Sequence, residues 1–249
     1  MKRKNPVAFL LPVILCLVAL LTGCVRYDVG VNFNTPQSGT IVQHIKIGEQ
    51  LTSLSPSDAK KWLNSVEERS RKLKGNVKKL NPQEIIVTIP FHNGKELADK
   101  FNQFFHTAVP DVSAIPKEEI DLVKLDSRIS LQQSNLFFVE RNKLDLTIDL
   151  RALGILSNQE KIIVSPDSLI DLEFQLNTPW IANSVSEREN LEPTVNVGNG
   201  LVWEIQPGQI NHIQAVFWLP SPLGIGAGAI VLLMITGFLL KYRRFPGIA

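Results

Sequence analysis

The sequence predicts an α+β fold, a curved antiparallel sheet with two helices on one face, followed by a C-terminal transmembrane helix. Apolar and polar residues alternate with a period of two in several segments, which indicates strands that bury one face. Two other segments combine a helix-start signal with apolar residues at helical spacing. Near the C-terminus, 18 consecutive residues carry no charge, which is long enough for a membrane span.

The N-terminal residues 1–23 read as a lipoprotein signal peptide, with a basic start and an apolar run of the usual length. The run ends in Leu21-Thr22-Gly23-Cys24, which resembles the bacterial lipobox. The cysteine of that motif is acylated on its sulfur, so we expect a lipid on Cys24. The only other cysteine, Cys16, lies in the segment that would be removed. The alternative is an uncleaved membrane anchor with an incidental cysteine.

Strands are expected at the alternating segments, and the first two should form an opening hairpin. The expected ranges are 27–33, 40–47, 84–89, 144–150, 172–176 and 213–217. Long alternation of this kind favours antiparallel sheets.

Two helices are expected between these strands. Ser55-Pro56-Ser57-Asp58 is a helix start with a serine cap and proline at the first position, and Gly75 ends that helix. The second begins at Asn93 with a capping-box-like pattern and stops at Pro110. The order is two strands, a helix, two strands, a helix and about five strands, which is typical of the α+β class.

The transmembrane helix is predicted at residues 223–240. Lys241, Arg243 and Arg244 follow it, so the positive-inside rule places the tail 241–249 in the cytoplasm and the domain 24–222 outside. All 24 acidic residues lie in that domain with 20 of the 26 basic ones, a net charge of −4. The overall charge of +2 therefore reflects topology and does not indicate nucleic-acid binding.

Both ends of the domain are close to an expected anchor. Cys24 almost directly precedes the first strand, and three residues separate Leu219 from the span. We therefore predict that the first and last strands run in opposite directions, begin and end in one plane at the bilayer, and could pair. Gly224, Gly226 and Gly228 form a small-residue face that could pack against another helix.

No catalytic, metal or cofactor motif stands out. The four histidines, His44, His92, His106 and His212, lack metalloprotease spacing. There is no nucleophile elbow or P-loop, and the carboxylate-rich segment 117–126 reads as solvated surface. We expect no catalytic residues, no metal and no cofactor, with a hydrolase of dispersed site as a minor alternative.

Apolar residues are the better candidates for function. Leu153, Ile155 and Leu156 predict a buried strand end, a pocket lip or a loop that touches the membrane. Trp218 precedes the span by five residues, a position that favours an interfacial tryptophan. Phe101, Phe104 and Phe105 are expected to pack in the core, the alternative being an apolar cavity for a lipid tail.

The chain resembles the LppM-like bitopic lipoproteins, and more narrowly their cyanobacterial and plastid branch, a domain of unknown function. The resemblance rests on LTGC, the opening CVRYDVGVNF, the closing NGLVWEIQPGQINHIQAVFWLPSPLGIG and the terminal KYRR. It implies a domain outside the cytoplasm, tethered at both ends. For the mycobacterial branch it implies an α+β domain that binds glycolipid, but no binding residues match position by position.

Together these features predict a non-enzymatic, doubly anchored module at the surface of the cell membrane or the thylakoid membrane. The bulk of the chain would be periplasmic or lumenal, and its partner would be membrane lipid or another apolar ligand. The alternative is a scaffold or assembly factor that binds an integral membrane protein.

Overall fold

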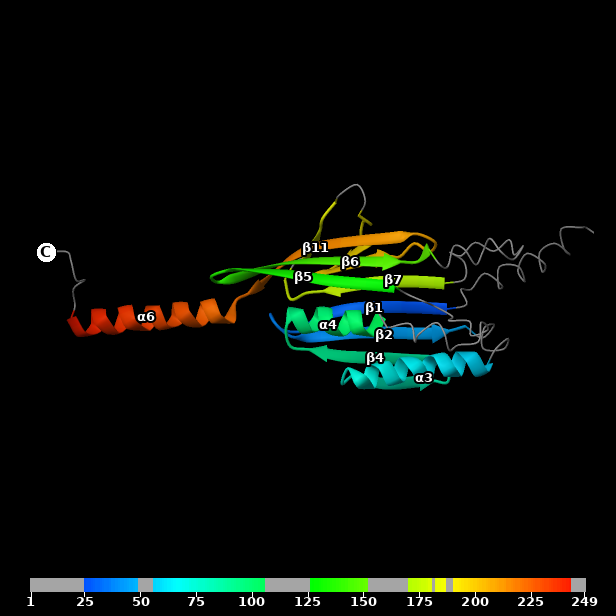
Figure 1. Cartoon of the computed structure of the whole chain (residues 1–249). Coiled ribbons are helices and arrows are strands. Elements are labelled where there is room, and N and C mark those ends of the chain that lie inside the picture. The colour runs from blue at the N-terminus through cyan, green and yellow to red at the C-terminus, as the bar shows by residue number, and fades with distance from the viewer. Residues whose placement is uncertain are drawn as a thin grey trace, which may run out of the picture.

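The computed structural model describes residues 25–48, 56–105, 126–151, 170–180, 182–186 and 190–242. These residues form two β-sheets and three α-helices (Figure 1). The α+β class is therefore confirmed. The single curved sheet is not, because the strands divide into a large sheet of seven strands and a small sheet of four.

The large sheet has the strand order β3-β4-β2-β1-β7-β10-β9. Its strands are β1 (Val25–Phe33), β2 (Gly39–Ile47), β3 (Asn76–Asn81), β4 (Glu84–Phe91), β7 (Ile170–Asn177), β9 (Val195–Val197) and β10 (Gly200–Glu204). Neighbouring strands are antiparallel except β1 and β7, which are parallel. The expected purely antiparallel sheet is therefore wrong at this one pair.

The small sheet has the order β5-β6-β11-β8 and is antiparallel throughout. Its strands are β5 (Asp126–Leu136), β6 (Val139–Asp149), β8 (Ala182–Ser184) and β11 (Ile210–Pro220). Leu136 pairs with Val139, so a turn of two residues, Phe137 and Phe138, joins β5 to β6. This long hairpin projects beyond the rest of the body (Figure 1).

The helices are α3 (Pro56–Lys72), α4 (Gly94–Phe105) and α6 (Pro222–Tyr242). The capping pattern predicted for α4 is present: the backbone N–H of Glu96 donates to Asn93 Oδ1 at 2.8 Å. The Glu96 carboxylate accepts the backbone N–H of His92, also at 2.8 Å. Helix α3 contacts β3 and β4, whereas α4 contacts β4 of the large sheet and β5 of the small sheet.

One continuous core joins both sheets and the helices α3 and α4. Phe101 and Phe104 are buried in it, which confirms their interpretation as core residues. The rings of Phe33 and Phe217 lie 5.0 Å apart and connect the two sheets. Trp203 is fully buried, and its Nε1 donates a hydrogen bond to the carbonyl of Leu191 at 3.1 Å.

The first and last strands run in the same direction, which corrects the prediction that they run in opposite directions and could pair. Strand β1 belongs to the large sheet and β11 to the small sheet. Tyr27, near the start of β1, shares a cavity wall with Ile148, whose partner in β11 is Asn211 near the start of that strand. The ends of the strands also meet, at Phe33 and Phe217. Val25 and α6 therefore lie at opposite ends of the body (Figure 1).

Candidate membrane-contact site

The apolar helix α6 extends away from the body, and none of its 21 residues is buried. By length and composition it is able to cross a membrane, and it is the one such helix among the residues that the structure describes. An apolar surface exposed on every side is typical of a helix whose solvent is lipid. This helix and the chain around its first turns are the candidate membrane-contact site.

Helix α6 is bonded to the small sheet through a single buried residue, Ser221. Its backbone N–H donates to the carbonyl of Phe138 at 2.8 Å. Its Oγ accepts the backbone N–H of Gly224 at 3.3 Å, which caps the helix, and the amide of Asn135 at 3.2 Å. Pro222 occupies the first helical position, where its missing N–H costs nothing. Helix α6 is therefore held against the β5–β6 hairpin and is not joined to it by a flexible linker.

The tip of this hairpin exposes consecutive apolar side chains. Leu136, Phe137 and Phe138 are 52%, 83% and 58% exposed. The described body exposes seven large apolar side chains outside α6, and three of them are these neighbours. We call residues 136–138 the hairpin tip. A contiguous exposed apolar patch usually marks a contact surface.

Phe137 adopts a backbone conformation that usually requires glycine. Its φ is 56°, and a two-residue hairpin with a positive φ at its first position favours glycine there. An L-residue in this region costs about 1–2 kcal/mol. The turn thus keeps a large aromatic side chain where a smaller residue would fold more easily.

Two glycines of α6 allow the hairpin tip to pack against the span. A Cβ on Gly224 would overlap the carbonyl oxygen of Phe137, and one on Gly228 would lie 2.8 Å from the ring of Phe138. A Cβ on Gly226 would meet nothing within 4 Å. Two of the three glycines of the small-residue face that could pack on another helix therefore contact the hairpin tip within the chain.

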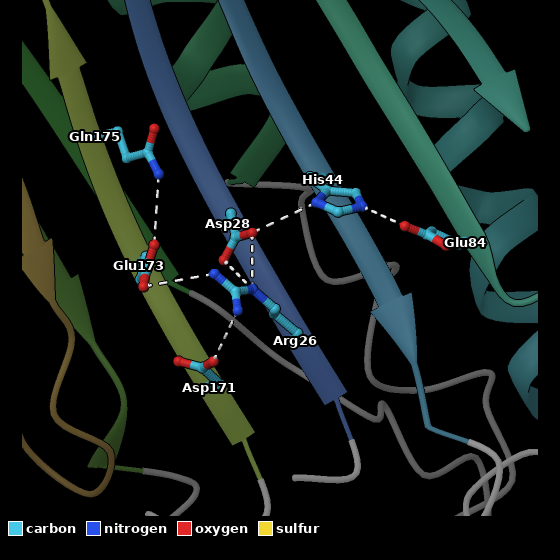
Figure 2. A network of polar contacts seen from close by, with 7 residues as sticks. All are labelled: Arg26, Asp28, His44, Glu84, Asp171, Glu173 and Gln175. Carbon is cyan, nitrogen blue, oxygen red and sulfur yellow. Dashed lines mark hydrogen bonds and ion pairs between the residues drawn. The ribbon is translucent and has the colours of Figure 1, made fainter. Parts of the chain in front are cut away.

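A polar network lies on the large sheet, near the start of β1 (Figure 2). Arg26 contacts three carboxylates, those of Asp28 at 3.0 Å, Glu173 at 3.6 Å and Asp171 at 3.7 Å. His44 links two carboxylates, with Nε2 at 2.7 Å from Glu84 and Nδ1 at 3.5 Å from Asp28. The hydrogen bond with Asp28 raises the pKa of Arg26, and the one with His44 lowers the pKa of Glu84.

This network is best explained as cross-strand pairing. It connects β7, β1, β2 and β4 in register, as opposite charges do on a solvated sheet face. Figure 2 shows seven residues, none of which carries a hydroxyl or thiol nucleophile beside His44. Among the described residues, no three His, Cys, Asp or Glu side chains are grouped so that they could hold a metal ion.

The described body has two hollows that differ in size and position. A cavity of about 20 Å³ between the sheets is lined by Tyr27, Phe101 and Ile148 among others, and it has room for about one water molecule. A wider hollow of about 680 Å³ lies between α3 and the β3–β4 hairpin, over Leu63 and Ile85. Pro56, the first described residue after the gap at 49–55, is one of the residues that line this hollow.

Of the predicted contact residues, the structure describes only Trp218. It lies half-buried in β11, opposite Arg141 of β6 and close to the end from which α6 leaves. Cys24 and the group Leu153, Ile155 and Leu156 lie outside the described residues, so their roles stay predictions. Sequence reasoning missed Phe137 and Phe138. The sequence does contain one signal for this site: two consecutive aromatic residues, flanked by mostly polar residues of β5 and β6.

The comparisons with known proteins give a family and one weak structural likeness. The sequence profile of a family described as "Protein of unknown function (DUF3153)" matches residues 29–245. The solved structure of the folded domain of LppM from Mycobacterium tuberculosis has a TM-score of 0.42 with this chain at 13% identity. The match covers 81% of this chain and 93% of that one. No curated protein sequence matches the chain.

Proposed function

We propose that this chain, which belongs to the DUF3153 family of proteins of unknown function, is a membrane-tethered module that contacts lipid. Its folded body would lie on one side of a bilayer and would not catalyse a reaction. The observation that carries the proposal is α6, apolar and exposed along its whole length. Leaving such a surface in water would cost about 25 cal/mol for each Å² of apolar area.

The side of the membrane follows from charge in the sequence. Lys241, Arg243 and Arg244 lie directly after the apolar run, and basic residues beside a span are retained in the cytoplasm. The body would therefore lie outside the cytoplasm, at the periplasmic face of the cell membrane or in the thylakoid lumen.

An acyl group on Cys24 would be a second apolar group, joined to the first residue of β1. Val25, the next residue, begins β1 at the end of the body opposite α6. Nine residues of strand extend over about 26 Å between their first and last Cα atoms. The lipid on Cys24 would thus enter the bilayer of α6 only if the body leaned over. On an upright body it would face away from that bilayer.

The scaffold alternative loses its main support, because Gly224 and Gly228 already contact the hairpin tip. A binding surface for a membrane protein would have to lie elsewhere on α6 or on the body. We therefore favour lipid as the partner.

Vesicle flotation tests the tether. Residues 25–249 and 25–220 would each be mixed with vesicles of phosphatidylcholine and phosphatidylglycerol and centrifuged in a density gradient. We expect the longer chain to float with the vesicles and the shorter chain to stay at the bottom. Equal flotation of both chains would contradict α6 as the tether.

A further inference from the structure

We infer that the hairpin tip, residues 136–138, is inserted among the lipid acyl chains beside the first turns of α6. The body would then be attached to the membrane by two rigidly connected elements, a helix that crosses the bilayer and a hairpin that enters one leaflet. This inference rests on the proposed function, because it requires α6 to be in the bilayer.

The length of the span determines the depth of the tip. The uncharged run from Leu223 to Leu240 has 18 residues, which extend over about 27 Å as a helix, while the hydrocarbon core is about 30 Å thick. No turn of α6 is therefore left over outside the core. Gly224 and Gly228 must lie in it, and so must whatever is packed against them.

The groups packed against these glycines belong to the hairpin tip. The carbonyl of Phe137 lies against Gly224, and the ring of Phe138 lies against Gly228. Gly228 follows Leu223 by five residues, so the Phe138 ring reaches about 7 Å below the start of the apolar run. All three side chains of the tip are more than half exposed, and Leu223 and Ile225 of the helix are exposed as well.

Part of the backbone of the tip is paired within the protein. In lipid each backbone N–H and C=O needs a partner inside the protein. Leu136 pairs with Val139 across the turn, and the carbonyl of Phe138 accepts the N–H of Ser221. The turn itself has two residues, the shortest hairpin connection.

Polar residues return immediately behind the tip, as expected where headgroups begin. Arg141 follows Phe138 by three residues, is exposed, and pairs across the sheet with Trp218. Arginine and tryptophan are both favoured at the membrane interface. The apolar tip and the polar residues behind it therefore match the change from acyl chains to headgroups in a bilayer better than they match an apolar contact with another protein.

Site-specific photo-crosslinking in the full chain tests the inference. Three variants would carry the photoreactive residue: Phe137→p-benzoylphenylalanine, Leu232→p-benzoylphenylalanine in the span, and Leu80→p-benzoylphenylalanine as matched control. Leu80 is also an exposed apolar residue near a hairpin turn. Strand registers place this β3–β4 turn beside the end of β2 and the start of β1, at the end of the body opposite α6. Each variant would be irradiated in native membranes and searched for lipid adducts by mass spectrometry.

We expect lipid adducts at positions 137 and 232 and at least tenfold fewer at position 80. Adducts at 232 without adducts at 137 would overturn the insertion of the tip and leave the tether intact. Absence of adducts at 232 would overturn the tether as well. A protein adduct at 137 in place of lipid would show that the tip docks on another protein, and this too would overturn the inference.

Discussion

Gly224→Ala is the change that most directly probes the contact between the span and the hairpin tip. A Cβ at this position overlaps the carbonyl of Phe137, which is backbone and cannot rotate away. A normal C···O contact of about 3.3 Å requires the tip to move by about 1–2 Å. That movement stretches the hydrogen bond from Ser221 to the Phe138 carbonyl.

The expected free energy has opposing contributions. Overpacking costs about 1–3 kcal/mol, and a weakened hydrogen bond costs up to about 1 kcal/mol. Alanine gains up to about 1 kcal/mol over glycine through its helix propensity. The net loss for Gly224→Ala is therefore about 1–2 kcal/mol. Gly226→Ala has the same propensity gain and no clash, so it should be neutral or slightly stabilising.

Thermal unfolding of the full chain in detergent micelles, followed by circular dichroism of the strands, provides the assay. For a body of this size, 1 kcal/mol corresponds to about 2–4 °C in Tm. Gly224→Ala should lower Tm by about 3–6 °C, and Gly226→Ala should leave it unchanged or raise it. Amide exchange at Ser221 should accelerate only in Gly224→Ala. Identical behaviour of the two variants would refute the packing of the tip on α6.

Three further predictions follow from particular residues. Ser221→Ala removes the cap of α6 and the partner of Asn135, so the free energy of unfolding should fall by about 1 kcal/mol; an unchanged thermal melt would contradict this role. The side chain of Lys100 and the N–H of His92 lower the pKa of Glu96 from 4.5 to about 2. The charged carboxylate therefore contributes stability above pH 4.5, and this contribution is lost as pH falls toward 2. Glu96→Gln should lower the free energy of unfolding by about 1 kcal/mol at pH 7, and in urea titrations this free energy should fall less steeply below pH 4.5. A variant that loses as much stability at pH 2 as at pH 7 would count against this account. Cys24→Ala should abolish incorporation of labelled palmitate by growing cells, and a variant that still incorporates the label would exclude Cys24 as the acceptor.

Much of the fold was predictable because its strands alternate so regularly. The expected strands at 27–33 and 40–47 correspond to β1 and β2 within two residues, and the expected strand at 144–150 corresponds to the second half of β6. Helix α4 was equally clear, since Asn93 and Glu96 form the capping contacts that their spacing indicates. In these segments the local pattern and the packed structure agree.

The division into two sheets was not predictable from the same patterns. Alternation shows that one face of a strand is buried, but it does not show against which sheet. The parallel pairing of β1 with β7 joins residues about 145 positions apart, and no local signal specifies it. The prediction that β1 begins in the plane where β11 ends failed for this reason, because the two strands lie in different sheets and run in the same direction.

The hairpin tip escaped prediction because it breaks a turn rule. Two-residue hairpins usually carry glycine or asparagine, whereas this turn has Phe137 and Phe138. The second half of strand β5 is also mostly polar, so apolar and polar residues alternate only weakly along its sequence. A residue that departs from the local rule at such a turn is better explained by its surroundings, here the first turns of α6.

The height of the distal end above the bilayer tests the central claim most directly. Residues 25–249 contain no cysteine, so Leu80→Cys and Phe137→Cys each allow a single fluorophore to be attached. Energy transfer from each position to acceptor lipids would be measured in vesicles. An upright body held by α6 and the hairpin predicts contact distance for position 137 and a separation of about 26 Å or more for position 80, the length of a nine-residue strand. Equal transfer from both positions would mean that the body lies along the membrane, and it would contradict the rigid attachment described above.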